Sequence, residues 1–267
     1  MPQLTLSPAT LQLLSPIIPL VTEDSDKSGF FNFTSSADTF TSSLNTSFAL
    51  NMQAGDDTVN LNGRGDDSIF TGSGNDTVYA GRGADNVEGG SGTDRLYGEE
   101  GYDVLLGGGD ADLLYGGADG DDLFGNSGND SLYGEAGRDF LAGGQGTDWL
   151  TGGGDADTFW FDDGNLFLGH GDIITDFSHA DGDKIDLRAI DANTALAGDQ
   201  AFRLVSGPTS ELGTMWLTQS DGDTWWVSFN TTADADLAHE TDFNLIITTA
   251  YVPGSGFPAP VASDFLF

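Results

Sequence analysis

Gly-Gly-Ser-Gly-Thr-Asp-Arg-Leu-Tyr, from Gly89 to Tyr97, is one copy of a nine-residue unit that dominates this chain. Gly143 to Thr151 repeats its glycines, its aspartate and its leucine as Gly-Gly-Gln-Gly-Thr-Asp-Trp-Leu-Thr. In the phase of these two copies, eleven blocks run without a gap from Asn62 to Trp160. Such self-similarity at a fixed period indicates a repetitive architecture.

Two positions of the unit carry most of its information. The sixth-position aspartates, with Asp57 of a weaker preceding copy, are Asp57, Asp67, Asp76, Asp85, Asp94, Asp103, Asp112, Asp121, Asp130, Asp139, Asp148 and Asp157. The eighth-position residues are Ile69, Val78, Val87, Leu96, Leu105, Leu114, Leu123, Leu132, Leu141, Leu150 and Phe159. A disordered or merely soluble acidic chain does not require acids in phase with apolar residues, so the pattern favours a folded repeat.

The length of the unit predicts strands. Nine residues are too few for a helix pair and suit a short strand followed by a Gly-rich turn. Position nine is tyrosine in every second block, at Tyr79, Tyr97, Tyr115 and Tyr133, which adds an 18-residue period. We therefore expect an all-β parallel β-roll, a solenoid with two strands per turn. Its eighth-position residues would meet in a thin core, and its turns would stack about 4.8 Å apart.

The segments before the roll are predicted as an end piece. Residues 1–27 are expected to form a tail or a partner-binding arm. Residues 28–61 are expected to hold degenerate repeats that cap the roll at 62–160, because solenoid ends need covering. Within them, Ala37 to Phe40 looks like a decayed block.

Beyond Trp160 the glycine repeat stops, and residues 161–267 alternate apolar and polar stretches. This pattern predicts a small C-terminal β-sandwich-like domain. Thr214–Thr218 and Thr224–Phe229, joined by Ser-Asp-Gly-Asp, are predicted to form a hairpin. Phe243–Thr248 would add another strand.

Composition limits the possible partners. The 267 residues include 43 acids against eight Lys and Arg, which gives a net charge of −35, and 39 glycines. Self-repulsion and glycine entropy oppose folding, so we expect a cationic partner. Nucleic acid is excluded because the few basic residues are scattered, and no apolar run approaches the length of a membrane span. The chain has no cysteine, so metal ions rather than disulfides would cross-link it.

The carboxylates are expected in the turns, stacked along both edges of the roll, where like charges repel. Ca²⁺ suits them best, because it takes about six to eight oxygen ligands, whereas Mg²⁺ prefers a smaller site and Zn²⁺ prefers nitrogen or sulfur. Turn carbonyls would supply further ligands, and the glycines proposed for this role are Gly72, Gly74, Gly81, Gly83, Gly90, Gly92, Gly108, Gly117, Gly144 and Gly146. Eleven blocks offer about nine or more sites between successive turns, and we expect folding to require calcium.

The blocks resemble the Gly-Gly-x-Gly-x-Asp-x-U-x nonapeptides of the RTX (repeats-in-toxin) family. The resemblance implies a parallel β-roll with Ca²⁺ in its turns. Some copies depart from this pattern. Asp110, Asp119 and Asp155 replace the fourth-position glycine, and Glu99, Asn126 and Glu135 replace the second.

A second resemblance lies in the C-terminal region. The segments Asp172-Ile-Ile-Thr-Asp-Phe-Ser and Asp181 to Asp191 are similar to the C-terminal domain of serralysin-type metalloproteases, whose protease domain this chain lacks. The resemblance implies further calcium ligands at Asp172, Asp176, Asp183 and Asp186, with solvated loop acids as the alternative. Ser263 to Phe267 resembles the terminal signal read by type I exporters. It implies a bacterial protein exported unfolded, which folds outside the cell as a secreted or surface-associated protein.

The sequence predicts no catalytic residues and no cofactor other than calcium. It has no Cys, no Gly-x-Ser-x-Gly and no His-Glu-x-x-His, and its histidines are His170, His179 and His239. An enzyme of unrecognised type in the C-terminal half remains a third reading.

The outward-facing residues leave the biological role open. The tyrosine ladder either stacks on sugars or another protein, or it stabilises its own sheet. Arg64-Gly65-Asp66 spells an adhesion tripeptide, or it arises by coincidence within a repeat. Our leading hypothesis is a non-catalytic structural or binding protein of the cell surface or matrix, with self-assembly or a surface glycan as its partner. The alternative is an accessory or carbohydrate-binding module that serves a separately encoded secreted enzyme.

Overall fold

The computed structural model of the chain describes residues 22–23, 30–162, 171–190, 203–206, 214–221, 224–230, 244–249 and 260–266. The tail predicted at residues 1–27 lies almost entirely outside the described residues. So do His170, His239 and Phe267.

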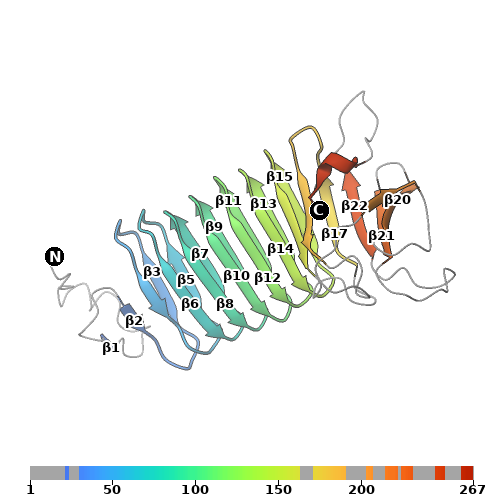
Figure 1. Cartoon of the computed structure of the whole chain (residues 1–267). Helices are drawn as coiled ribbons and strands as arrows, with labels where there is room; N and C mark the ends of the chain where they lie inside the picture. Colours follow the sequence, from blue (N-terminus) through green and yellow to red (C-terminus); the bar gives the residue numbers. More distant parts are fainter. Residues whose placement is uncertain are drawn as a thin grey trace.

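All the strands of the described residues belong to two sheets (Figure 1). Sheet A has eleven strands in the order β1 (Thr22–Glu23), β2 (Phe30–Asn32), β4 (Ala49–Asn51), β6 (Ser68–Ser73), β8 (Asn86–Ser91), β10 (Val104–Gly109), β12 (Asp122–Ser127), β14 (Phe140–Gln145), β16 (Thr158–Asp162), β18 (Lys184–Ala189) and β23 (Phe265–Leu266). Sheet B has twelve in the order β19 (Arg203–Val205), β20 (Thr214–Asp221), β21 (Thr224–Asn230), β22 (Asn244–Thr249), β17 (Ile173–Phe177), β15 (Trp149–Gly154), β13 (Ser131–Ala136), β11 (Leu113–Ala118), β9 (Arg95–Glu100), β7 (Thr77–Arg82), β5 (Thr58–Leu61) and β3 (Thr39–Ser42).

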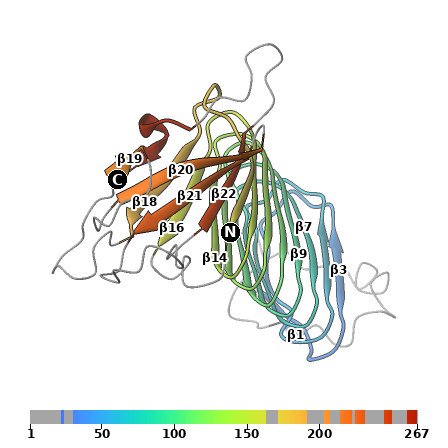
Figure 2. The same ribbon diagram turned by 90° about the vertical axis from the view of Figure 1, so that its right-hand side faces the viewer.

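Consecutive strands from β2 to β18 alternate between the two sheets, so each turn of the coil contains two strands. Within a sheet the repeats pair in parallel with an 18-residue register, as between Leu96 of β9 and Leu114 of β11. Figure 2 shows the coils receding behind one another, with the two sheets facing each other. The predicted all-β parallel roll with two strands per turn is therefore confirmed.

The strands reach further into the Gly-rich half than the pattern indicated. β11, for example, continues through Gly116, Gly117 and Ala118, the first three positions of the next block. Only positions four to six then form the turn. Along each strand, position eight and position one of the next block both face inward, and position nine between them faces outward.

The eighth-position residues form the core, as predicted, and each is at most 2% exposed. Because position one is mostly glycine, each sheet contributes a single row of apolar side chains, and the two rows form one core between the sheets. Each Å² of apolar surface buried stabilises the fold by about 25 cal/mol. Because this core is thin and buries little apolar surface, interactions in the turns must contribute much of the stability.

The N-terminal turns are longer by one residue and end in an aromatic cluster. β3 and β5 pair with a 19-residue register, as do β4 and β6. Phe33, Phe40 and Phe48 are buried there, and ring centroids in this cluster lie 5.4 to 5.7 Å apart. The decayed block at Ala37 to Phe40 therefore leads into β3, which pairs in parallel with β5 as part of the roll.

The C-terminal strands extend the two sheets of the roll. β17 and β18 pair in parallel with β15 and β16, and β23 adds beyond β18 after a short 3₁₀ helix, η1 (Ala262–Asp264). β20 and β21 form the predicted antiparallel hairpin, and β22 joins them to β17. The two layers expected of a sandwich-like region are thus continuous with the roll.

Candidate metal centres

The sixth-position aspartates form two hydrogen-bonded ladders. The backbone N–H of Asp94 donates to Oδ1 of Asp112 at 2.8 Å, and Asp103 donates to Asp121 at the same distance. The ladder at the start of the sheet B strands contains Asp38, Asp57, Asp76, Asp94, Asp112, Asp130, Asp148 and Asp172. The ladder at the start of the sheet A strands contains Asp67, Asp85, Asp103, Asp121, Asp139, Asp157 and Asp183. One oxygen of each carboxylate thus ties two successive turns together.

The second carboxylate oxygen is buried without a hydrogen-bond donor in most rungs. These Oδ2 atoms belong to Asp57, Asp76, Asp85, Asp94, Asp103, Asp112, Asp121, Asp130, Asp139, Asp157 and Asp172. Every one of these residues is at most 3% exposed. A buried carboxylate oxygen without a partner is costly, and rows of them along both edges indicate that a cation belongs there.

The first-position glycines make room for these oxygens. A β-carbon at Gly107 would lie 2.5 Å from Oδ2 of Asp112 and 3.0 Å from the carbonyl oxygen of Gly125 in the next turn. At Gly116 the corresponding distances, to Asp121 and Gly134, are 2.5 and 2.9 Å. A carboxylate oxygen and a carbonyl oxygen therefore converge beside each of these glycines.

The glycines predicted as ligands occupy positions two and four, whereas the glycines beside the carboxylate oxygens occupy position one. A signal was present, because position one is glycine in all eight blocks from Gly89 to Trp160, whereas position two varies. Thr71 occupies position one in an earlier block, and its hydroxyl donates to the carbonyl of Gly89 at 2.7 Å. In the later blocks, the carbonyl of the corresponding glycine lies beside the aspartate Oδ2. Here the threonine hydroxyl donates a hydrogen bond to that carbonyl instead.

Burial raises the pKa of the ladder carboxyls. Desolvation is the largest cause, opposed by the backbone hydrogen bond to Oδ1 and reinforced by neighbouring carboxylates. The pKa rises to about 8 at Asp112 and Asp157, and to about 7 at Asp85 and Asp103. Without a counter-ion, the roll therefore holds protons at near-neutral pH, and a divalent cation would displace them.

Comparison with protein-family models gives one family. The model of the RTX calcium-binding nonapeptide repeat matches residues 54–87, 61–96, 88–123, 115–150 and 133–165. The chain contains RTX calcium-binding nonapeptide repeats. No curated protein matches the chain. Among solved structures, the AlgE6R3 subunit of the Azotobacter vinelandii mannuronan C5-epimerase is similar at 26% identity, over 60% of this chain and 78% of that one, with a TM-score of 0.39.

The residues of the RTX repeats fit calcium. Within the described part of the chain, no group of three or more His, Cys, Asp or Glu side chains forms a metal cluster. The blocks that begin at Gly89, Gly98, Gly107, Gly116, Gly125 and Gly134 instead each offer a carboxylate oxygen next to a main-chain carbonyl oxygen. This is the mixed oxygen donor set that Ca²⁺ accepts and Zn²⁺ does not favour. Bound calcium would supply positive charge between turns, and the aspartates and carbonyls would hold it.

The second- and fourth-position residues have left-handed backbone conformations. Of the predicted ligand glycines, Gly90 has φ of 109° and Gly92 has φ of 114°. The six residues that replace glycine at positions two and four also fall in this region, with φ between 73° and 76° for Asp110, Asp119 and Asp155 and between 72° and 79° for Glu99, Asn126 and Glu135. The turns therefore impose one backbone shape on non-glycine residues, which are strained by it.

The four acids suggested by the serralysin-type resemblance have different surroundings. Asp172 continues a ladder and has the orphan Oδ2, and burial raises its pKa to about 8. Asp176 accepts from the N–H groups of Gly152 and Gly153 at 3.0 and 2.8 Å, and Asp183 accepts from Asp157 and Ser178. Asp186 pairs with Arg188 at 2.6 Å, which lowers the pKa of its carboxyl. Asp172 and Asp183 thus continue the two ladders, but only Asp172 of the four keeps an Oδ2 without a donor.

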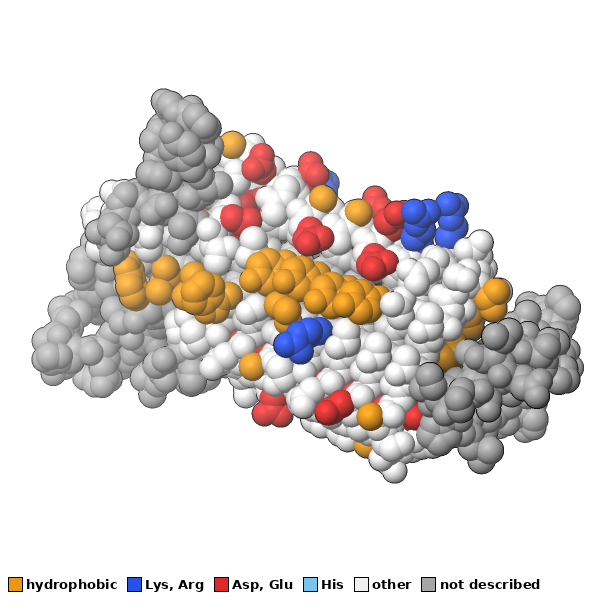
Figure 3. All heavy atoms as spheres, turned by 180° about the vertical axis from the view of Figure 1, so that it is seen from behind, with side chains coloured by type: hydrophobic (Ala, Val, Ile, Leu, Met, Phe, Trp, Pro, Cys, Tyr) orange, Lys and Arg blue, Asp and Glu red, His pale blue; other side chains and the backbone are white. Residues whose placement is uncertain are grey.

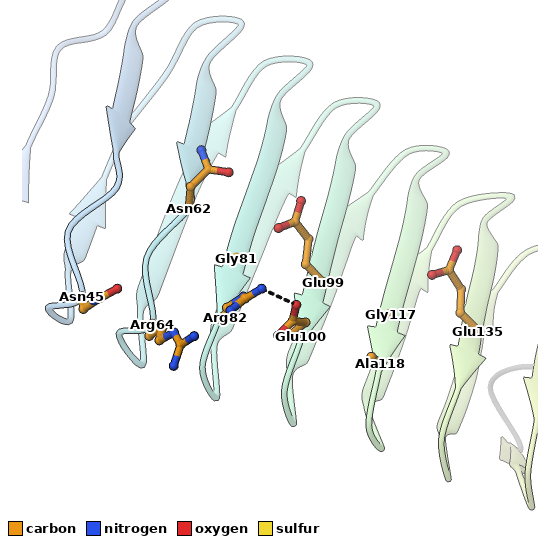
Figure 4. Close-up of a pocket in the computed structure, with 10 residues that line it drawn as sticks. All are labelled: Asn45, Asn62, Arg64, Gly81, Arg82, Glu99, Glu100, Gly117, Ala118 and Glu135. Carbon is orange, nitrogen blue, oxygen red and sulfur yellow. Dashed lines mark ion pairs between the residues drawn. The ribbon is translucent and has the colours of Figure 1, made fainter.

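A groove on the outside of sheet B is lined by the charged residues Arg64, Arg82, Glu99, Glu100 and Glu135 (Figure 4). Its volume is about 500 Å³, and Arg82 pairs there with Glu100 at 2.8 Å. Arg64 lines the same groove, but Asp66 accepts a hydrogen bond from the N–H of Ala84, and a β-carbon at Gly65 would meet the backbone of Thr46 at under 3.0 Å. The repeat itself thus accounts for the Gly and Asp of the Arg-Gly-Asp tripeptide.

The tyrosine ladder stacks on itself. Ring centroids lie 4.6, 5.0 and 4.8 Å apart from Tyr79 through Tyr97 and Tyr115 to Tyr133, and the planes differ by at most 12°. Figure 3 shows a continuous row of hydrophobic side chains along one face of the roll. Because each inner ring has both faces covered by its neighbours, the ladder stabilises sheet B and offers no open ring face to a sugar between Tyr79 and Tyr133.

Among the described residues, no helix is both long and apolar enough to cross a membrane.

Proposed function

We propose that this protein is a secreted, calcium-folded RTX protein that acts as a non-catalytic structural or binding component of the cell surface or matrix. The observation that carries the proposal is the pair of buried aspartate ladders, in which one oxygen of nearly every carboxylate lacks a donor. Cations along both edges would relieve that arrangement, as protonation does at lower pH, and a calcium-poor cell interior would then leave the chain unfolded.

The test is a calcium titration of the full chain. Circular dichroism is expected to change from a mainly unfolded spectrum in EDTA to a β spectrum in millimolar Ca²⁺. Native mass spectrometry of the folded form is expected to count about nine or more ions. A β spectrum that survives EDTA, or a count of one or two ions, would contradict the proposal.

The export part of the proposal concerns the C-terminal region. Segments of the chain resemble a serralysin-type C-terminal domain and a type I export signal. Phe265 is buried and pairs with Ile185, while Asp264 contacts His179 at 2.6 Å and accepts from the N–H of Val261 at 2.8 Å. In the folded protein this segment is packed against the sheet, so an exporter would have to bind it before the chain folds. This supports export of the unfolded chain. Deleting Asp264 to Phe267 should leave the protein inside the producing cell, and normal export of that truncation would refute this part.

The non-catalytic part rests on the sequence, which lacks cysteine, a nucleophile elbow and a His-Glu-x-x-His helix. The acids have a metal-binding role that needs no catalysis.

A further inference from the structure

The N-terminal coil of the roll, residues 30–51, carries almost no charge. From Ser28 to Gly55 the one charged residue is Asp38, which is only 3% exposed. The stretch from Asp56 to Asp162, by contrast, contains 23 acids and four bases. In a chain with a net charge of −35, this coil is therefore the surface that another acidic molecule can approach with the least repulsion.

The exposed side chains of this coil are small or uncharged. They are Ser35, Ser36, Ala37, Thr39, Thr41, Ser43, Leu44, Asn45, Thr46 and Ser47. Among them, the apolar side chain of Leu44 is 45% exposed. Protein interfaces are depleted of charged residues at their centre, so the composition of this surface suits contact with another protein.

The two sheets end differently at this coil. β1 pairs with β2 in antiparallel orientation and covers the edge of sheet A. Sheet B ends at β3, and no strand of the described residues pairs with its outer edge (Figure 1). On the inner side, the carbonyls of Asp38 and Ser42 accept from residues 58 and 62 at 2.9 and 2.8 Å. Because alternate residues of a strand bond to the same neighbour, Thr39 and Thr41 direct their N–H and C=O groups outward.

The outer edge of β3 has none of the features that usually block strand pairing. Its sequence, Thr39-Phe40-Thr41-Ser42, contains no Lys and no Pro, and its register with β5 has no bulge. Threonine is β-branched and favours the extended conformation. The side chains of Thr39 and Thr41 are both exposed. The edge is thus an accessible template for one more strand.

We propose that β3 pairs in antiparallel orientation with β3 of a second copy of this chain, which joins two rolls end to end. Thr39 would exchange its N–H and C=O bonds with Thr41 of the partner subunit, and sheet B would continue through both copies. Such a two-fold contact is self-complementary and stops at a dimer. A head-to-tail contact is less favourable, because the sheet edges at the other end are β23, of two residues, and β19, which contains Arg203.

This inference rests on the calcium-folded state of the proposed function and names a partner for its structural role. A four-residue edge and its flanking turns bury little area compared with a stable interface. The dimer is therefore weak and depends on concentration, as suits a component that assembles where it accumulates.

The test is sedimentation equilibrium of the full chain in Ca²⁺, from low micromolar to submillimolar concentration. We expect the mass to rise from 27.9 kDa toward twice that value. Hydrogen exchange of the Thr39 and Thr41 amides should be fast in the dilute protein and slow in the concentrated protein, because both N–H groups become bonded only in the dimer.

Thr41→Pro removes an outward N–H without removing a bond to β5, and it should weaken the association at least about tenfold. Thr41→Val is the matched control, because it keeps the N–H and the β-branched shape, and it should leave the association unchanged. If Thr41→Pro loses its calcium-dependent circular dichroism, the double variant Thr39→Glu, Thr41→Glu replaces it. That variant places like charges directly opposite each other in the paired edges and should also abolish the dimer.

Circular dichroism and ion counting in Ca²⁺ separate a failure of this inference from a failure of the proposed function. A chain that folds with calcium but keeps a mass of 27.9 kDa at every concentration would overturn the inference alone. Slow exchange at Thr39 and Thr41 in that monomer would show that the same chain covers the edge. A dimer that survives in both the Pro and the Glu variants would place the interface elsewhere, and an equal loss in Thr41→Val would exclude backbone pairing as its basis.

Discussion

Asp112 places its Oδ2 atom 2.5 Å from where a β-carbon of Gly107 would lie. The two residues belong to one nonapeptide, and the same relationship recurs along both edges of the roll. It explains why a glycine with an ordinary backbone conformation is retained at position one: the space of its side chain is used by the carboxylate.

Gly107→Ala is therefore expected to damage a calcium site. The added methyl group would displace the carboxylate or the adjacent turn, at a cost of about 1 to 3 kcal/mol in the free energy of unfolding with calcium bound. Thermal unfolding in Ca²⁺ and ion counting by native mass spectrometry measure the two effects.

Gly109→Ala is the matched control on the same strand. Its β-carbon would have no neighbour nearer than 3.8 Å. We expect its free energy of unfolding to change by no more than about 0.5 kcal/mol, with no ion lost. Equal effects of the two substitutions would show that position one is not reserved for the carboxylate.

Asp112→Asn separates the two functions of the carboxylate. Asparagine keeps an oxygen that accepts the 2.8 Å hydrogen bond from Asp94, but it replaces the orphan oxygen with an amide that repels a cation. We expect the loss of one calcium ion and a free energy of unfolding lower by about 1 to 3 kcal/mol.

Asp110→Asn removes the same charge from a neighbouring, exposed position of the same block. Asparagine tolerates the left-handed conformation of residue 110, whose φ is 73°. The calcium count should stay at the wild-type value. A loss of one ion in this variant as well would mean that net charge, and not ladder geometry, controls binding.

Much of this architecture follows from the period of the sequence. The positions of Asp94 and Leu96 in their block predict which residues lie in the turn and which in the core. The 18-residue period of the tyrosines predicts two sheets. The ladder hydrogen bonds do not follow from the period, because they depend on the register between turns.

The ends of the roll show where the pattern fails. Asp172 and Asp183 occupy ladder positions 24 and 26 residues after Asp148 and Asp157, so inserted loops hide them from a nine-residue scan. Asp38, within the block that the sequence shows as decayed, lies 19 residues before Asp57 and so departs from the 18-residue spacing of the regular coils. In each case the hydrogen bond from one turn to the next preserves a spatial repeat that the sequence spacing has lost.

The ion-free protein should become more folded in acid. Its ladder carboxyls have pKa values raised by burial, to about 8 at Asp112 and about 7 at Asp85, from an ordinary value of 3.8. Between the ordinary pKa and the raised pKa of these carboxyls, the folded state binds more protons than the unfolded state. The stability of the ion-free fold therefore falls as pH rises through this range. The protonated roll is thus favoured below about pH 4 and progressively lost through pH 6 to 8.

Circular dichroism in EDTA from pH 8 to pH 5 measures this effect, and we expect β signal to increase as the pH falls. With saturating Ca²⁺ the signal should change little over the same range, although calcium affinity should drop because protons compete for the carboxylates. A fall in β signal on acidification in EDTA would mean that the buried carboxyls do not dominate the ion-free state.

The left-handed residues at position two predict a stabilising substitution. Glu99 has φ of 79°, a conformation that costs an L-residue about 1 kcal/mol and glycine almost nothing. Its side chain points away from the sheet in Figure 4, so little packing is lost on its removal. Glu99→Gly should therefore raise the free energy of unfolding in Ca²⁺ by about 1 kcal/mol, measured by denaturant titration.

Glu88→Gly removes the same charge from an extended strand position, where glycine costs about 0.5 to 1 kcal/mol in lost chain entropy. The two variants should thus shift the midpoint in opposite directions, and a shared direction would show that charge removal outweighs backbone strain in these turns.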